Sequence, residues 1–392
     1  MSGAWEKKKV GEICTLQRGF DLPKRLREPG AYPLVSSSGI IDTHIKPKVT
    51  GPGVVTGRSG SIGNVFYIEE EFWPLNTCLY VKDFHGNDPE FICYFLKQFN
   101  LGRFASGAGV PTLNRNTVHD ELVLFPSSLS EQKRIVAILD EAFGAIARAK
   151  ENAARNLANA RELFDSYLNR VFTEKGEGWE EKTLSDVTTK IGSGATPKGG
   201  KNAYKEEGIN LVRSLNVHDR SFKMKNLAFI DDQQAEKLNN VILESEDVLL
   251  NITGASVARC CVLPDSILPG RVNQHVSILR TKKDQLNPFF LCYLLTSKEY
   301  KDQLLSTGEK GGSTRQAITK AQLQNFVIKF PTSLTVQRKI CSELFNQYEQ
   351  SSRLESIYQK KLAALDELKE SILQNAFTGQ LTSKSKELEL VP

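Results

Sequence analysis

Apolar residues recur at alternating spacings of three and four between residues 131 and 172, a stretch without proline. This spacing predicts one long α-helix with a narrow apolar stripe, as in a coiled coil. Pro126 and Ser130 precede the stretch as helix-start signals, and Thr173 and Gly176 follow it as stop signals. At about 1.5 Å per residue the helix would span roughly 63 Å.

A second stretch, residues 331–379, repeats the stripe on nearly the same register, with interruptions at Gln347, Ser351 and Lys369. A stripe this narrow needs a partner helix, and the other copy is the obvious partner. Chain order then makes the pair antiparallel, with two globular domains at opposite ends, related by an approximate two-fold axis. The residues expected to pack in this helix pair are Ile135, Leu139, Ile146, Leu157, Phe164 and Leu168 from the first helix and Ile340, Leu344, Leu354, Leu362, Leu365 and Ile372 from the second.

The repeat extends beyond the two helices. Residues 126–139 align with 331–344, and the start of the chain, residues 5–8, returns at 179–182. Such self-similarity predicts a tandem duplication, in which each unit is one variable domain followed by one segment of fixed length. The expected parts are a globular domain at 1–125, a helix at 126–175, a second globular domain at 176–330, a second helix at 331–379 and a flexible tail at 380–392.

The globular segments alternate short β-type runs with one helical run. The expected strands are residues 54–56, 64–69, 78–82 and 122–125 in the first copy and 248–252, 259–263, 275–281 and 326–330 in the second. The expected helices are residues 88–99 and 287–295. Because short strands dominate, the predicted fold class is α/β (α+β), with a twisted and largely antiparallel sheet in each domain.

Composition is ordinary for a globular protein: of 392 residues, 40% are hydrophobic and 25% are charged, with a net charge of +5. This excludes a disordered or fibrous chain. The seven cysteines include no CxxC pair, so they fit neither a disulfide framework nor a zinc ribbon, and we expect a reducing, cytoplasmic compartment. The pattern predicts neither a membrane span nor an export signal.

The sequence lacks the common catalytic and cofactor motifs, with no GxGxxG, P-loop or HExxH. Residues 287–290 (Asn-Pro-Phe-Phe) resemble the Asn-Pro-Pro-Phe/Tyr loop of amino-methyltransferases, but their duplicate is Asp-Pro-Glu-Phe at 88–91. A capped helix start with proline at the first position explains both copies better. Cys93 and Cys292 fall at equivalent apolar positions, as core residues do. We therefore expect no catalytic residue and no metal ligand.

Basic residues and glycine-rich loops favour nucleic-acid binding. Residues 7–27 and 198–225 are rich in lysine and arginine, and such patches can neutralise DNA phosphates, although a solvated surface gives the same pattern. The loops at 57–63 and 106–115 carry Arg, Ser and Asn, with equivalents at 251–254 and 311–316. Arginine, asparagine and glutamine can pair with base edges, although hairpin turns use the same residues.

The candidate DNA-binding residues follow from these patches and loops. They are Arg18, Lys24, Arg25, Ser36, Ser37, Arg58, Ser59, Asn76, Arg103, Asn114 and Arg115 in the first domain and Lys198, Lys201, Arg213, Ser214, Asn216, Asn251, Thr253, Arg271, Asn273, Gln274, Thr314 and Arg315 in the second.

The chain resembles the specificity (S) subunit of type I restriction-modification systems. The doubled organisation carries this resemblance, together with a phrase similar to P-P-L-x-E-Q-x-R/K-I at 126–135 and 331–340 and a loop of the L-N-R type at 113–115 and 318–320. The similarity covers nearly the whole chain to Leu381. The second copy departs from the pattern, with Val336 in the place of Glu131 and no asparagine or proline in its loop.

The resemblance implies two target-recognition domains that each read one half of an asymmetric, bipartite site on double-stranded DNA, with the helices as a ruler. Half-sites about one helical turn, roughly 34 Å, apart would suit such a protein. It also implies two methyltransferase subunits, which transfer a methyl group from S-adenosylmethionine to adenine, and restriction subunits, which use ATP and Mg²⁺. These cofactors would be bound by the partner subunits and none by this chain.

Two other functions fit part of the pattern. An autonomous DNA methyltransferase, with residues 287–290 as its catalytic loop, would bind S-adenosylmethionine unaided. If the chain is instead a coiled-coil scaffold without DNA contact, charge reversal of Arg58 and Arg213 would leave the DNA affinity of the complex and its salt dependence unchanged.

Overall fold

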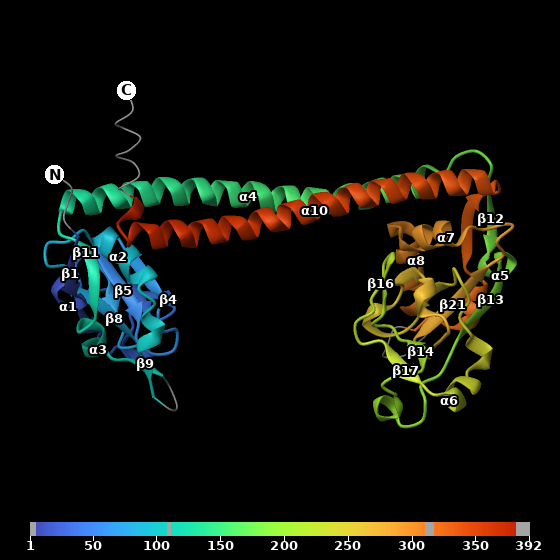
Figure 1. Cartoon of the computed structure of the whole chain (residues 1–392), viewed down its shortest axis with the longest axis horizontal. Helices are drawn as coiled ribbons and strands as arrows, with labels where there is room; N and C mark the ends of the chain where they lie inside the picture. Colours follow the sequence, from blue (N-terminus) through green and yellow to red (C-terminus); the bar gives the residue numbers. More distant parts are fainter. Residues whose placement is uncertain (1–4, 108–110, 310–316, 382–392) are drawn as a thin grey trace. The chain divides into compact units, whose positions relative to one another are not determined.

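A computed structural model describes residues 5–107, 111–309 and 317–381. The chain folds into two compact units, one formed by residues 1–154 and 359–392 and the other by residues 155–358. The boundary between the units runs through both long helices. Each unit therefore contains one globular domain and about half of each helix (Figure 1).

The two long helices are α4 (Leu129–Glu174) and α10 (Leu334–Ala376), each a single uninterrupted element. The start of α4 differs from the prediction: Ser130 lies inside the first turn, and Ser128 is the capping residue. The Ser128 carbonyl accepts a hydrogen bond from the Gln132 N–H at 3.1 Å, and its Oγ accepts one from the Glu131 N–H at 3.4 Å. The capping position is therefore two residues earlier than the sequence indicated.

The predicted stripe is largely covered, in part by the domain cores, which include Ile135, Leu139, Phe164, Leu168 and Leu344. Ile135, Leu139, Ile146, Phe164, Leu168 and Leu344 are buried, and Leu157, Ile340, Leu362, Leu365 and Ile372 are half-buried. The prediction for Leu354 is wrong: its side chain is 36% exposed, whereas Ser351 is 2% exposed. The apolar spacing favoured Leu354, but the stripe of α10 continues through the polar interruption at Ser351.

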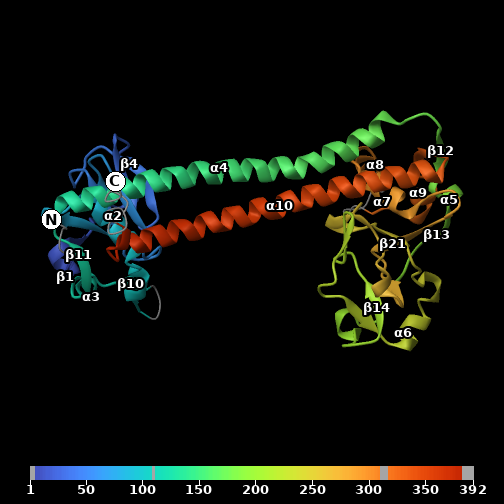
Figure 2. The same ribbon diagram turned by 45° about the horizontal axis from the view of Figure 1, so that its top comes forward.

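Contacts in both units show that α4 and α10 run antiparallel. In the first unit Lys150 Nζ lies 2.5 Å from Asp366 Oδ1. In the second unit Arg161 Nε lies 3.1 Å from Glu355 Oε2, and the ring centres of Phe164 and Tyr348 are 5.3 Å apart. Rising residue numbers on α4 thus meet falling numbers on α10, and the ribbons run side by side in both views (Figures 1 and 2).

Three sheets form the core architecture of the first unit. The first strand pairs with the last, a four-stranded antiparallel sheet has the order β2-β8-β5-β6, and a three-stranded sheet has the order β4-β3-β7 with β3 and β7 parallel. The strands are β1 (Trp5–Lys9), β2 (Thr15–Arg18), β3 (Tyr32–Ser36), β4 (Gly39–His44), β5 (Gly53–Gly57), β6 (Val65–Ile68), β7 (Trp73–Pro74), β8 (Cys78–Asp83), β9 (Ala105–Ser106), β10 (Thr112–Leu113) and β11 (Leu122–Pro126). The helices of this domain are α1 (Val10–Ile13), α2 (Pro89–Gln98) and α3 (Arg115–His119), with η1 (Lys24–Leu26) and η2 (Leu101–Phe104) as 3-10 turns.

The second unit repeats this topology. Its sheets have the orders β12-β22, β13-β21-β18-β19 and β17-β14-β20, again with one parallel pair, β14 and β20. The strands are β12 (Trp179–Thr183), β13 (Thr188–Ser193), β14 (Ile209–Val212), β15 (Val217–His218), β16 (Ser221–Phe222), β17 (Ala228–Ile230), β18 (Val248–Asn251), β19 (Cys260–Val262), β20 (Gly270–Val272), β21 (Val276–Thr281) and β22 (Val327–Pro331). The helices are α5 (Leu184–Val187), α6 (Asp232–Glu236), α7 (Pro288–Thr296), α8 (Lys298–Glu309) and α9 (Lys320–Gln324), with short 3-10 turns η3 (Gly200–Ala203), η4 (Asn239–Val241), η5 (Gly254–Ser256) and η6 (Asp265–Ile267). The predicted duplication and fold class are confirmed.

The helix starts after Asp88 and Asn287 are capped as the sequence predicted. Asp88 Oδ1 accepts a hydrogen bond from the Phe91 N–H at 3.0 Å, and Asn287 Oδ1 accepts one from the Phe290 N–H at 3.1 Å. Proline is the first residue of both helices. Residues 287–290 therefore form a helix start, and Cys292, like Cys93, packs in a core.

Each core joins a globular domain to both long helices. In the first unit Phe377, just after α10, packs against Phe91 with ring centres 5.2 Å apart. In the second unit Phe172 of α4 packs against Phe290 at 5.4 Å. The ends of the long helices are therefore part of the domain cores, which fixes each domain on its helices.

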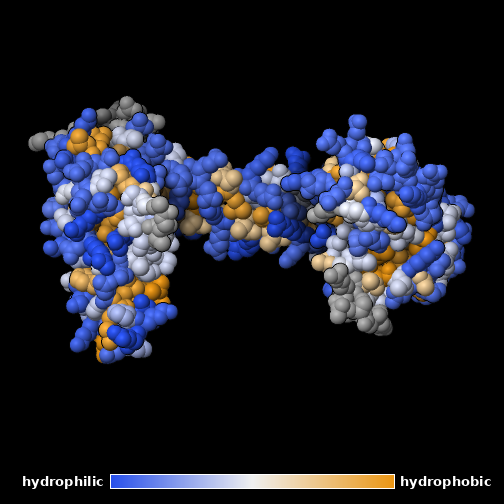
Figure 3. Space-filling view, turned by 90° about the horizontal axis from the view of Figure 1, so that it is seen from below, coloured by the Kyte–Doolittle hydropathy of each residue, from blue (hydrophilic) through white to orange (hydrophobic). Residues whose placement is uncertain are grey.

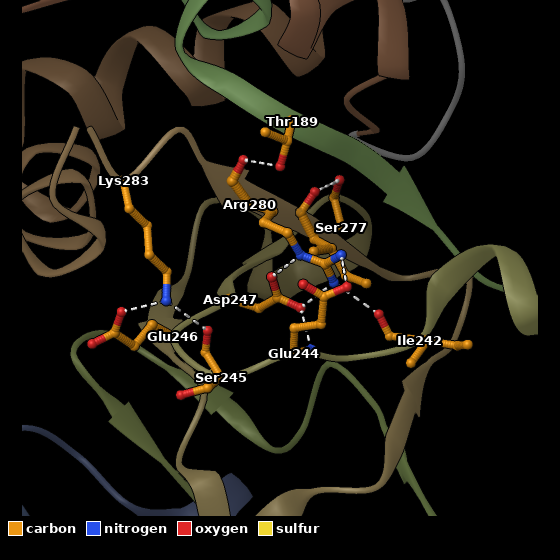
Figure 4. Close-up of polar contacts among 10 residues, drawn as sticks. Thr189, Ile242, Glu244, Ser245, Glu246, Asp247, Ser277, Arg280 and Lys283 are labelled. Carbon is orange, nitrogen blue, oxygen red and sulfur yellow. Dashed lines mark hydrogen bonds and ion pairs between the residues drawn. The ribbon is translucent and has the colours of Figure 1, made fainter. Parts of the chain in front are cut away.

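An ion pair supports the four-stranded sheet of the second unit (Figure 4). Asp247, which directly precedes β18, is completely buried. Its Oδ1 and Oδ2 accept hydrogen bonds from Arg280 Nε and Nη2, both at 2.8 Å. Arg280 also donates to the Ile242 carbonyl at 2.9 Å. The hydrogen bond with Asp247 raises the pKa of Arg280. This cluster ties the loop before β18 to β21.

Candidate DNA interface

Four predicted residues of the first unit meet at one end of its four-stranded sheet. Arg18, Arg58, Asn114 and Arg115 line one pocket, here called the arginine pocket, with Leu79, Ser106, Thr112 and Leu113 completing its lining. Arg18 is the last residue of β2, Arg58 directly follows β5, and Arg115 opens α3. Three segments that are distant in sequence thus bring three guanidinium groups together.

Hydrogen bonds hold the arginine pocket in shape. Arg58 Nη1 donates to the Asn76 carbonyl at 3.0 Å, and the Arg58 carbonyl accepts from the Leu113 N–H at 2.8 Å. Asn114 Oδ1 accepts from the Asn116 N–H at 3.0 Å, so this side chain caps α3. Its amide nitrogen is not used by the cap. Asn114 therefore orients Arg115 as well as lining the pocket.

A second hollow beside it contains Ser36 and Asn76, together with Asp21, Arg27, Ile41 and Thr77, among others. Ser36 Oγ donates to the Gly39 carbonyl at 3.2 Å. The backbone N–H groups of Ser37 and Ser59 both bond to Thr77, at 3.3 Å to Oγ1 and 3.1 Å to the carbonyl oxygen. The hydrogen bond from Arg58 to the Asn76 carbonyl links a residue of each hollow.

Three other basic residues of the first domain lie in different surroundings. Lys24 and Arg25 are exposed in the 3-10 turn η1. Arg103 lies on the rings of Phe99 and Phe104, 4.8 and 4.6 Å from their centres, and 3.6 Å from Glu121. Its guanidinium therefore has local partners, and the structure does not bring Arg103 into the arginine pocket.

A pocket of the second unit is lined by Ser214, Leu215, Thr253, Gly254, Ala255, Ser256, Arg259 and His275. Matching backbone bonds show which residues are equivalent in the two units: Leu113 N–H bonds to the Arg58 carbonyl and Ile318 N–H to the Ile252 carbonyl, both at 2.8 Å, so Thr253 corresponds to Ser59, next to Arg58. Thr253 Oγ1 is hydrogen-bonded to His275 Nδ1. We call this pocket the threonine pocket.

Four of the predicted residues in the second domain are buried: Asn216, Asn251, Arg271 and Asn273. Asn216 Nδ2 donates to the Lys223 carbonyl at 2.8 Å, and Asn251 Nδ2 donates to the Ser214 carbonyl at 2.9 Å. Asn273 Oδ1 accepts from the His275 N–H at 3.0 Å. These side chains shape the loops around the threonine pocket from within, so base contact by them stays a prediction.

The structure places Arg271 away from this pocket. Its Nε donates to the Ala235 carbonyl at 3.3 Å and its Nη1 to the Gly270 carbonyl at 3.0 Å. Burial lowers the pKa of its guanidinium. The sequence could not separate Arg271 from surface arginines, because the carbonyl that binds its Nε is 36 residues away along the chain.

The remaining predicted residues of the second domain differ in setting. Arg213 lies on the ring of Tyr204, 5.0 Å from its centre, and its Nη2 donates to the Asn226 carbonyl. Gln274 is exposed and accepts a hydrogen bond from Thr196 Oγ1. Lys198 is exposed, and Lys201 is in the 3-10 turn η3. Thr314 and Arg315 lie outside the described residues.

Sequence reasoning missed several pocket residues. Arg259 and His275 line the threonine pocket, and Arg27 lines the hollow beside the arginine pocket. No histidine is among the candidate residues that the sequence indicates. A usable signal was present, since His275 directly follows the predicted Asn273 and Gln274.

Burial raises the pKa of the Cys14, Cys78 and Cys341 thiols to about 12, so these thiols are protonated at neutral pH. In the described part of the chain no group of His, Cys, Asp and Glu side chains is placed to hold a metal ion. Within residues 5–107, 111–309 and 317–381 no helix is both long and apolar enough to cross a membrane.

Comparison with known proteins gives a consistent result. Residues 3–155 and 176–363 match the family described as type I restriction modification DNA specificity domain. The type I restriction enzyme MjaVIII specificity subunit of Methanocaldococcus jannaschii is 24% identical over 306 residues, which cover 74% of this chain and 69% of that protein. The EcoBI specificity subunit of Escherichia coli is 23% identical over 181 residues, 46% of this chain and 37% of that protein.

Two solved structures share the fold. A chain from a type I restriction-modification system, solved to show complex assembly and conformational transition, has a TM-score of 0.76 at 21% identity and covers 97% of this chain and 99% of its own. The HsdS subunit from Thermoanaerobacter tengcongensis has a TM-score of 0.65, also at 21% identity, with 97% and 98% covered. With both halves matched to one family, this chain belongs to the type I restriction-modification specificity subunits and carries two DNA recognition domains.

Proposed function

We propose that this chain reads a bipartite, asymmetric DNA site, with one half-site bound by each domain. The observation that carries the proposal is that two domains whose main sheets have the same topology carry different side chains at equivalent positions. Arg58 and Ile252 are one such pair, since their carbonyl groups accept the equivalent backbone hydrogen bond. Equivalent frameworks with different side chains suit two different half-sites.

The antiparallel helices α4 and α10 set the number of base pairs between the half-sites in this proposal. Support comes from the cores, since Phe172 and Phe377, at the ends of the helical segments, are each packed inside a domain core. A domain fixed in this way on a long helix cannot change its position without repacking its own core.

We further propose that the chain positions two methyltransferase subunits and the restriction subunits for adenine methylation or cleavage in the cytoplasm. S-adenosylmethionine, ATP and Mg²⁺ would be bound by these partners. Exposed apolar side chains on the long helices support a protein-binding role (Figure 3). The most exposed of them are Leu163, Phe345, Ile357 and Leu368.

Long-read methylation mapping of the host with and without this gene tests the proposal. We expect one bipartite, adenine-methylated motif to disappear when the gene is deleted and to return with the wild-type gene. A methylome that does not change contradicts the proposed function.

Phosphate contacts can be tested separately with the purified complex. Replacing Lys24 and Arg25 by alanine removes two exposed positive charges from η1. We expect weaker DNA binding, a salt slope reduced by about one for each lost phosphate contact, and no change in base preference. Lys82→Gln, at the end of β8 away from the arginine pocket, is the matched charge control.

A further inference from the structure

The two domains differ most clearly in charge at equivalent places. Arg18 and Ser193 are the last residues of β2 and β13. Arg58 and Ile252 directly follow β5 and β18, and each carbonyl accepts one equivalent backbone hydrogen bond. Asn114 and Thr319 cap α3 and α9, which begin with Arg115 and Lys320. At these three pairs of equivalent positions, the second domain therefore has one positive charge, on Lys320, and the first domain has three.

Within the arginine pocket, Arg58 differs from its two neighbours. Arg18 and Arg115 are exposed, with Arg18 Nη2 3.3 Å from Asp21 Oδ1, whereas Arg58 is half-buried. Its Nη1 is held by the Asn76 carbonyl at 3.0 Å, which fixes the plane of the guanidinium and leaves its other N–H groups for a ligand. Leu79 and Leu113, each 2% exposed, contribute apolar lining to the pocket. Arg58 thus presents an oriented pair of donors in a site from which water is partly excluded.

The chemistry of such a group selects its ligand. A half-buried, oriented guanidinium matches two acceptors that lie side by side in one plane, and in the major groove of DNA guanine offers them as O6 and N7. Exposed and flexible arginines are better suited to phosphates, which surround every base. The three arginines are therefore divided between one base-reading position and two phosphate-binding positions.

We propose that Arg58 reads a guanine in the half-site bound by the first domain, while Arg18 and Arg115 hold the neighbouring phosphates. The second domain does not read guanine at the equivalent position, because Ile252 has no donor in its side chain. This inference rests on the proposed function and adds a base identity to it.

The test uses the full chain assembled with its methyltransferase partners and duplexes that carry the mapped motif. Each guanine is replaced in turn by 7-deazaguanine, which lacks the N7 acceptor and keeps O6. For one guanine, in one half-site, we expect the wild-type complex to lose at least about fivefold in affinity. The Arg58→Met complex, whose side chain has no donor for N7, should bind normal and modified duplexes within twofold of each other.

Two further variants separate base reading from charge. Arg115→Gln should weaken binding to both duplexes equally and reduce the salt slope by about one. The Lys82→Gln complex should lose as much affinity for the modified duplex as the wild-type complex does. If no guanine responds to the replacement, or if Arg58→Met shows the same loss as the wild type, the assignment of Arg58 is overturned.

A second measurement covers the case in which Arg58→Met fails to assemble. Methylation mapping in cells that express Arg58→Gln should show one guanine of the motif relaxed to other bases, with all other positions kept. An unchanged motif overturns the inference. The absence of any bipartite motif in wild-type cells overturns the proposed function itself, so the two failures are distinguishable.

Discussion

Gln132 and Gln337 hold the same place in the two halves of the chain and make three hydrogen bonds each, two of them equivalent. Gln132 Oε1 accepts from the Asp88 N–H and Gln337 Oε1 accepts from the Asn287 N–H, at 2.9 and 2.8 Å. Each Nε2 donates to the carbonyl of the proline that ends a strand, Pro126 of β11 or Pro331 of β22. Their second Nε2 bonds go to Asn87 Oδ1 and the Gln285 carbonyl. One buried amide thus joins a long helix, a strand end and a domain helix.

Replacing Gln337 by leucine removes these bonds and leaves the Asn287 N–H and two carbonyl groups without partners. We expect the unfolding free energy to fall by about 2–3 kcal/mol and the Tm by about 5 °C, measured by circular dichroism. Gln350→Leu, on the exposed surface of the same helix, is the control. Equal effects of the two substitutions would show that the buried amide contributes nothing.

Asp247→Ala should be among the most damaging substitutions in the second unit. It leaves the guanidinium of Arg280 without the carboxylate that accepts two of its hydrogen bonds. Breaking a buried pair by removing one partner costs about 3–5 kcal/mol. Glu246→Ala removes the partner of Lys283 in an exposed pair and should cost about 0–1 kcal/mol. Chemical denaturation of the two variants checks the order, and a reversed order would contradict it.

Ser351→Ala should stabilise the helix pair. Ser351 Oγ is buried and has no hydrogen-bond partner among the described residues. Replacement by alanine removes an unsatisfied group, which is worth about 1 kcal/mol or more, and also improves helix propensity. Ser356→Ala, at an exposed position of α10, measures the propensity effect alone. The prediction requires a higher Tm for Ser351→Ala than for Ser356→Ala, and equal values would refute it.

The stability of the first unit should fall in mild acid because of His119. Its Nε2 accepts a hydrogen bond from the Leu16 N–H at 2.9 Å, which requires the neutral ring. Burial, followed by the charge of Arg115, lowers the pKa of His119 below its ordinary value, although Asp120 opposes this. The unfolded chain therefore binds the proton more readily. The contribution of His119 is complete above about pH 6.5 and is lost as the pH falls from there toward the lowered pKa.

His119→Gln tests this dependence, since glutamine keeps an acceptor and does not titrate. It is also the residue at the equivalent position of the second half, Gln324. We expect the Tm of the variant to fall less than that of the wild type between pH 8 and pH 5.5. Parallel losses in both proteins would exclude His119 as the cause.

Local and periodic features were predictable from the sequence. The caps at Asp88 and Asn287 involve contacts within three residues, so the local sequence alone specifies them. The stripe of α4 and α10 follows from helix periodicity, with Leu354 as the exception. There the sequence offered a larger apolar residue, but the helix phase places Ser351 on the buried side.

Long-range polar contacts were not predictable. Asn251 is fixed by the Ser214 carbonyl, 37 residues away, and Gln132 by the Asp88 N–H, 44 residues away. The composition of the loops placed Arg58, Asn114 and Arg115 among the candidates. The same composition could not distinguish them from Arg271, because burial depends on elements that only the folded chain brings together.

The first unit takes its core from both ends of the polypeptide, since Phe377 packs against Phe91 and Phe95 with ring centres 5.2 and 6.0 Å apart. The second unit is continuous from residue 155 to residue 358. On the ribosome all of the second unit is therefore synthesised before Phe377 is added. The domain that is translated first closes its core last, and its Phe91 surface stays uncovered until the final turns of α10 emerge.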